Sequence, residues 1–333
     1  MPTVVKPLRR SSFLLAAAAG LWVVCSVAAV LLAGGTLPFD RPMLHGAPVV
    51  RQVVAATVAL AFALLIMAVT WLLTRKRVIP DLALRAPADR GSRREVLGLW
   101  LYGAAVLVAG RILGQWLFGE GIGLHLNGSV FGATRLQTPA EVCCWAAYNV
   151  VGYALVPYLV FRRLGYTREA LNLKSVDRRN DTLVVLIVLA IEAAGELSVS
   201  GVRQLSASQL LVGGALSFGL HLIGTGLPVM IFIYAVLLPR YVRLTGSAAA
   251  ATLLGGLSYA ALHLSEYWTV YDSPRHAGLS LLFVLLTFVP PGMVKTFLTL
   301  RSGNAWVHLW AYHAIAPHVT MDTPLIVKVF GLR

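Results

Sequence analysis

Two glutamates with helical spacing are the first residues in this chain that are suited to acid–base chemistry. Glu192 and Glu196 lie four residues apart in an otherwise apolar stretch, and this spacing puts both carboxylates on one face of a helix. Paired carboxylates at membrane depth suit metal ligation, proton relay or water activation. The alternative is that Glu196 lies at the outer interface, and that Glu192 alone is buried and paired with a histidine or an arginine.

Histidines form the second candidate group. His221, His263 and His313 lie in three separate apolar segments. A lone histidine in such a helix is usually a packing residue, but three in one part of the chain favour a shared polar site. His308 and His318 flank His313 at a spacing of five, which does not align on one helical face, so we expect both at the membrane interface.

Two basic residues also interrupt apolar segments. We expect Arg111 to pair with an acid on another helix or to extend its head group to the interface. Lys295 follows Pro290-Pro291, and we expect it to extend inward to the interface. Aromatic residues near segment ends predict an interfacial belt rather than a binding cage. They are Tyr267, Trp268, Trp306, Trp310 and Tyr312.

The composition predicts the elements that must position these groups. Of 333 residues, 58% are hydrophobic and 13% are charged, which excludes a soluble enzyme, a disordered chain and a secreted disulfide scaffold. We therefore predict an all-α, polytopic membrane helical bundle. The net charge of +14 is assigned to loops that face anionic lipid rather than to nucleic acid. Cys25, Cys143 and Cys144 have no metal-site or disulfide spacing.

Apolar runs predict about nine transmembrane helices, because a helix that crosses a bilayer needs about 20 apolar residues. The run 204–239 carries no Asp, Glu, Lys or Arg, and Gly224 to Pro228 interrupt it. It is long for one span and short for two, so it crosses once or forms a broken helix pair. The nine segments are 13–35, 52–74, 96–119, 142–161, 182–201, 204–239, 244–265, 277–300 and 302–321.

The basic residues predict the orientation. With a single crossing of 204–239 and a cytoplasmic N-terminus, 20 basic residues fall inside and 7 outside. We therefore expect a multi-pass protein of the cell membrane with its C-terminus outside. The first apolar run, 11–38, exceeds the roughly 7–15-residue core of a signal peptide, and we expect it to be retained. The abundance of Ala, Leu, Val and Arg favours a bacterial inner membrane.

Charge density drops after Asp181, and most of the embedded polar residues follow it. We divide the chain there into an N-terminal transmembrane half with four spans and two basic loops (1–181), a C-terminal transmembrane core (182–321) and a short tail (322–333).

The C-terminal half resembles a known family. Tyr259, three residues and His263 resemble the second motif of the CAAX-protease and bacteriocin-processing family (CPBP, also called Abi). The stretch 300–306 followed by His313 resembles the third motif, and 235–239 resembles the segment just after the first. The resemblance covers roughly 226–318. It implies an intramembrane peptidase, in which a glutamate activates water while histidines and an asparagine position it and stabilise the oxyanion.

The sequence departs from this pattern at the groups that the chemistry needs most. Val229 and Met230 occupy the positions of the family's glutamate pair, and Tyr234 occupies the position of its arginine. Neither Val229 nor Met230 can accept a proton. In the third motif, Pro317 replaces Asn or Asp.

Three functions remain open. The protein is a non-catalytic member that acts as a scaffold, chaperone or binding protein, an active endopeptidase with a relocated glutamate base, or a transport or lipid-binding protein. The relocated base would be Glu192, Glu196 or Glu266, acting with His263 or His313. Glu266 lies three residues after His263, on the same face if the helix continues. The expected partners are the lipid bilayer and a membrane-protein or peptide substrate. The sequence specifies no cofactor and leaves metal binding open.

Overall fold

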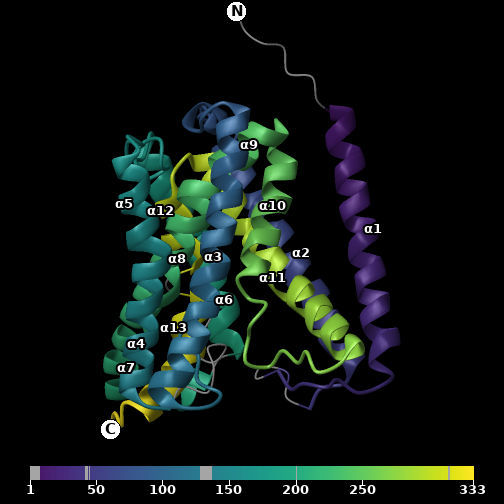
Figure 1. Cartoon of the computed structure of the whole chain (residues 1–333), viewed down its shortest axis with the longest axis vertical. Helices are drawn as coiled ribbons and strands as arrows, with labels where there is room; N and C mark the ends of the chain where they lie inside the picture. The colour runs from purple at the N-terminus through teal and green to yellow at the C-terminus, as the bar shows by residue number, and fades with distance from the viewer. Residues whose placement is uncertain (1–7, 42–43, 45, 128–136, 200, 314–315) are drawn as a thin grey trace, which may run out of the picture.

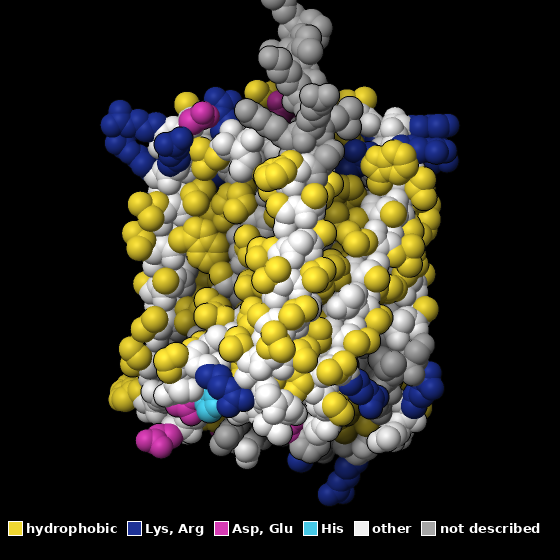
Figure 2. All heavy atoms as spheres, turned by 90° about the vertical axis from the view of Figure 1, so that its right-hand side faces the viewer, with side chains coloured by type: hydrophobic (Ala, Val, Ile, Leu, Met, Phe, Trp, Pro, Cys, Tyr) yellow, Lys and Arg dark blue, Asp and Glu magenta, His cyan; other side chains and the backbone are white. Residues whose placement is uncertain are grey.

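The computed structural model describes the chain except for residues 1–7, 42–43, 45, 128–136, 200 and 314–315, and without side-chain placement at 8–12, 196–199, 201, 313, 316–319 and 321. The described residues form an all-helical bundle without strands (Figure 1). A band of hydrophobic side chains separates two ends that carry lysines and arginines (Figure 2), as expected of a protein embedded in a bilayer.

Six helical runs are long and apolar enough to cross a membrane. They are α1 (from Phe13 to Ala33 within Leu8–Ala33), α2 (Val49–Thr74), α3 (Asp89–Phe118), the Pro139–Arg163 run that contains α4 (Pro139–Asn149) and α5 (Val156–Arg163), the Ala207–Thr245 run, and α11 (Pro274–Ser302).

The other three predicted segments are also helical but do not meet that criterion. They correspond to α6 (Arg178–Val199), α10 (Ala248–Ala261), and the pair α12 (Ala305–His308) and α13 (Ala316–Val329). Helix α13 extends beyond the predicted end at 321 and packs against α7 (Ala207–His221). Most of the predicted tail is therefore part of the bundle.

The run Ala207–Thr245 is one continuous helix rather than a broken pair. It passes from α7 at one end of the molecule through α8 (Leu227–Val229) to α9 (Leu238–Thr245) at the other (Figure 1). Two π-helical stretches, Leu222–Gly226 and Met230–Leu237, join these parts. The extra residue per turn accommodates the glycines and the proline without ending the helix.

The middle of this run is buried on every side. All residues from Val229 to Leu238 are buried, most of them fully. A helix that is apolar around its whole circumference has to lie inside the bundle, and this one does. We call Ala207–Thr245 the central helix.

The loops that were predicted to share one side of the membrane contact one another. Arg77 pairs with Asp181 and donates to the carbonyl of Ser302, while Arg85 donates to Asn172 and to the carbonyl of Gly303. The two basic loops and the turn after α11 therefore lie at the same end of the bundle.

Helices α10 and α11 pack through glycines. A Cβ atom on Gly292 would lie 2.6 Å from Cβ of Tyr259 and 2.9 Å from Cα of Gly256. Because the second contact is with backbone, the neighbour cannot move aside without separating the helices. Close approach of two membrane helices at small residues is a common source of stability in bilayers.

We expect Gly292→Val to lower the melting temperature of the purified protein in detergent, because overpacking of this kind costs about 1–3 kcal/mol. Gly278→Val, on the same helix with nothing within 4 Å of its Cβ position, is the matched control and should leave the melting temperature unchanged. Equal losses in the two variants would contradict close packing at Gly292.

Candidate functional site

A buried polar cluster forms where α10, α11 and α6 meet. We define it as Glu192, Tyr259, His263, Glu266 and Lys295, whose side chains are all nearly inaccessible. Tyr259 comes from α10, Lys295 from α11 and Glu192 from α6, while His263 and Glu266 follow the end of α10. The pairing of α10 with α11 at Gly256 and Gly292 sets the depth at which these groups face one another.

Glu266, one of the three candidate bases, pairs with His263, although not on a continuous helix. Helix α10 ends at Ala261, and the chain turns so that Oε1 of Glu266 lies 2.7 Å from Nδ1 of His263. The His263 ring stacks on Phe288 at 3.9 Å between centroids. Its Nε2 has no hydrogen-bond partner among the residues that the structure describes. A carboxylate on Nδ1 orients an imidazole so that Nε2 could accept a proton.

Lys295 lies within the bundle, so the prediction that it extends to the interface is wrong. Only 1% of its surface is exposed, and its Nζ lies 3.6 Å from the ring centroid of Tyr259 and 5.5 Å from that of Tyr312. These rings form a cation–π site for the ammonium group. The carboxylate of Glu192 provides an attractive charge. Tyr312, predicted as an interfacial residue, is part of this environment instead.

The remaining candidate residues do not join this cluster in the described part of the chain. The side chains of Glu196 and His313 lie outside the described part of the chain, so the structure does not place them. His308 is fully buried against the ring of Tyr234 at 4.2 Å between centroids, and its predicted interfacial position is wrong. Arg111 is exposed on the outside of the bundle and forms no ion pair with a described residue.

His221 does not join the polar cluster. Its Nε2 bonds Oδ2 of Asp322 on α13, and its ring packs edge-on against Trp145. Sequence reasoning missed this pair because Asp322 was assigned to a tail. The apolar residues on both sides of it, continuing to Val329, were the available signal for a helix.

Val229 and Met230 are fully buried in the central helix. Tyr234, at the position of the family's arginine, is also fully buried, and its carbonyl accepts a hydrogen bond from Asn172 at 2.8 Å. A carboxylate is therefore absent from both positions where the resemblance requires one. In the described residues, no group of three or more His, Cys, Asp or Glu could hold a metal ion.

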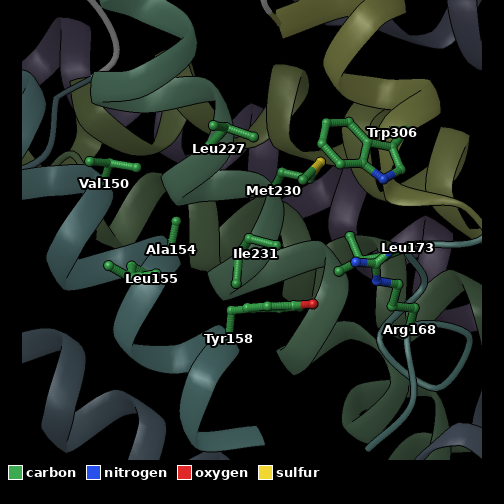
Figure 3. Close-up of a pocket in the computed structure, with 10 residues that line it drawn as sticks. All are labelled: Val150, Ala154, Leu155, Tyr158, Arg168, Leu173, Leu227, Met230, Ile231 and Trp306. Atoms are coloured by element: carbon green, nitrogen blue, oxygen red, sulfur yellow. The ribbon is translucent and has the colours of Figure 1, made fainter. Parts of the chain in front are cut away.

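Met230 lines an apolar cavity of about 370 Å³ between the central helix and the Pro139–Arg163 run. Figure 3 shows Val150, Ala154 and Leu155 on one side of it, and Trp306 and Arg168 on the other. His263 and Glu266 line neither this cavity nor the one beside Arg85 and Glu95. A comparison of the chain with protein-family models, curated proteins and solved structures finds no match.

A double-mutant cycle measures the coupling between Glu192 and Lys295. We expect Glu192→Gln and Lys295→Met each to lower the melting temperature, because removing one partner leaves a buried charge uncompensated at a cost of about 3–5 kcal/mol. The double variant should lose less than the sum of the two, since neither charge remains.

The exposed pair Glu169–Lys174 is the matched control for this cycle. Its atoms lie 3.4 Å apart, with 53% and 67% of the side-chain surfaces exposed. Glu169→Gln and Lys174→Met should leave the melting temperature almost unchanged. Additive losses at Glu192 and Lys295 would show that the two charges are not coupled.

Proposed function

We propose that this chain is a divergent, CPBP-like multi-pass membrane protein that has lost the family's peptidase mechanism and acts as a membrane scaffold or binding protein. The observation that carries the proposal is the burial of Val229 and Met230 in apolar packing, with Met230 beside an apolar cavity. A peptidase of this type needs a carboxylate and a water molecule at that place. Apolar side chains there can neither accept a proton nor hold water.

The buried charges fit a role in holding the helices together. Arg240 is fully buried, bonds Glu95 on α3 at 2.8 Å and lies over the rings of Phe161 and Tyr166. Breaking such a pair costs several kcal/mol, so it fixes the relative positions of the central helix and its neighbours.

A second candidate function has one observation in its favour. The 2.7 Å contact between Glu266 and His263 meets the geometric requirement for a relocated base. The argument against it is that substrate cannot reach the pair, because His263 is fully buried. Hydrolysis would need a movement that admits water and a peptide bond to Nε2.

The test is proteolysis by the full-length protein in phospholipid vesicles, supplied with a pool of quenched-fluorescent peptides. We expect no more cleavage than in vesicles that contain His263→Ala or Glu266→Gln. The physical reason is the absence of a carboxylate at Val229 and Met230 and the burial of the His263–Glu266 pair.

The control for this experiment is His276→Ala, which removes a partly exposed histidine paired with Asp272 at 2.5 Å. Cleavage by the wild type and by His276→Ala, but not by His263→Ala and Glu266→Gln, would establish the second candidate and refute the first. All variants are compared only after they elute from size exclusion as the wild type does.

The proposal includes nine spans, with the N-terminus in the cytoplasm and the C-terminus outside. Its support is that Arg77 and Arg85 of the loop 74–95 bond Asp181 and Asn172 of the loop 162–181, and also bond carbonyls of the turn after α11. Positive charge concentrated on one end favours the cytoplasmic side for that end.

Alkaline phosphatase, which is active only outside the cytoplasm, tests the orientation. A fusion after Arg333 should be active, and a fusion after Lys174 should be inactive, because these positions follow an odd and an even number of spans. The reverse pattern would contradict the orientation, and equal activities would contradict the number of spans between them.

A further inference from the structure

The apolar cavity between the Pro139–Arg163 run and the central helix has the chemistry of a lipid site. Of its ten lining residues, none is acidic, and Arg168 is the only one with a formal charge. Its volume of about 370 Å³ falls in the range of small-molecule sites. The cavity is built mainly from Val150, Ala154 and Leu155 on one side, and from Leu227 and Met230 of the central helix on the other.

The cavity opens toward the surface that faces hydrocarbon rather than water. Leu155 lines it and is 47% exposed, and Val151, Val156 and Leu159 on the same helical run are exposed beside it. Large apolar side chains in this number on the outside of a bundle indicate contact with lipid tails. An acyl chain can therefore enter sideways from the bilayer.

Arg168 lies at the polar end of the cavity. Figure 3 shows its guanidinium and the hydroxyl of Tyr158 at the same end, with Trp306 nearby. Arg168 lies in the loop after α5, at the end of the bundle that gathers the basic loops. Tryptophan and arginine at this level are typical of the head-group region of a bilayer.

The guanidinium of Arg168 is available to a ligand. It is exposed and makes no side-chain hydrogen bond or ion pair with any residue that the structure describes. The neighbouring acid, Glu169, pairs with Lys174 at 3.4 Å. A planar guanidinium binds the oxygens of a phosphate with two parallel hydrogen bonds.

We infer that this cavity binds one phospholipid with an anionic head group, with an acyl chain beside Met230 and Ile231 and the phosphate on Arg168. The site goes beyond the proposed function and does not rest on it. The cavity shares Met230 with the argument for lost peptidase chemistry, but the lipid site is argued from the apolar lining and Arg168. A peptide suits it less well, since backbone amides need hydrogen-bond partners in an apolar setting. Apart from Arg168, the lining side chains offer only the Tyr158 hydroxyl and the Trp306 indole.

The experiment uses the full-length protein in nanodiscs of phosphatidylcholine with a small fraction of phosphatidylglycerol that carries a photoreactive acyl chain. After illumination, mass spectrometry of the digested protein locates the cross-links. We expect them on the 150–158 and 227–231 stretches, and we expect unlabelled phosphatidylglycerol to compete more strongly than phosphatidylcholine.

Arg168→Gln should weaken this competition about fivefold, which is the usual effect of one basic residue near an anionic lipid. Arg163→Gln is the matched control, because it removes an exposed arginine at the same end that does not line the cavity. It should leave competition unchanged. Equal weakening in both variants would show general attraction of lipid to a basic surface and would overturn the site.

A variant that fills the cavity tests the acyl-chain part. Ala154→Phe should abolish cross-linking on 227–231. Because Ala154 is nearly buried, Leu155→Trp at a half-exposed position provides a second variant that folds more readily. Retained cross-linking at 227–231 in a correctly eluting variant, or equal competition by the two lipids, would overturn the inference.

Discussion

The bundle depends on the complete burial of the middle of one apolar helix, from Val229 to Leu238. The run from Ala207 to Pro239 contains no Asp, Glu, Lys or Arg, and its middle is apolar on every face. Packing on all sides removes the most apolar surface and brings α3, the α4–α5 run, α10, α11 and α12 around it. Polar pairs flank its buried middle, His221–Asp322 before it and Arg240–Glu95 after it.

The buried charge of Lys295 is compensated by groups from several helices. A lysine at membrane depth is costly, and it persists only where its surroundings compensate the charge. Lys295 has the rings of Tyr259 and Tyr312 and the charge of Glu192 around it. These groups come from three different parts of the chain, so the compensation also fixes the helices that carry them. A structural network of this kind needs no water, in contrast to a hydrolytic site.

The same helix explains why an apolar cavity lies beside the positions that resemble a peptidase motif. In the proposed resemblance, Val229 and Met230 stand where the glutamate pair of a peptidase would hold a polar, hydrated centre, and Met230 lines the cavity. The space between the central helix and the Pro139–Arg163 run is lined mainly by apolar side chains and is suited to hydrocarbon. Met230 therefore links the proposed loss of peptidase chemistry to the proposed acquisition of a lipid site.

The sequence by itself determined the helical class and named Glu266 as one of three candidate bases, because length, apolar runs and short spacing are local properties. It left open whether 204–239 crosses once or forms a broken pair, and the continuous helix Ala207–Thr245 decided this. It did not determine the burial of Lys295 and His308 or the pair His221–Asp322. The partners in that pair are 101 residues apart, and only the packing of α13 on α7 brings them together. The tertiary structure also decided that Arg168 lies at an apolar cavity, since a loop residue and a helix face meet there through the position of the central helix.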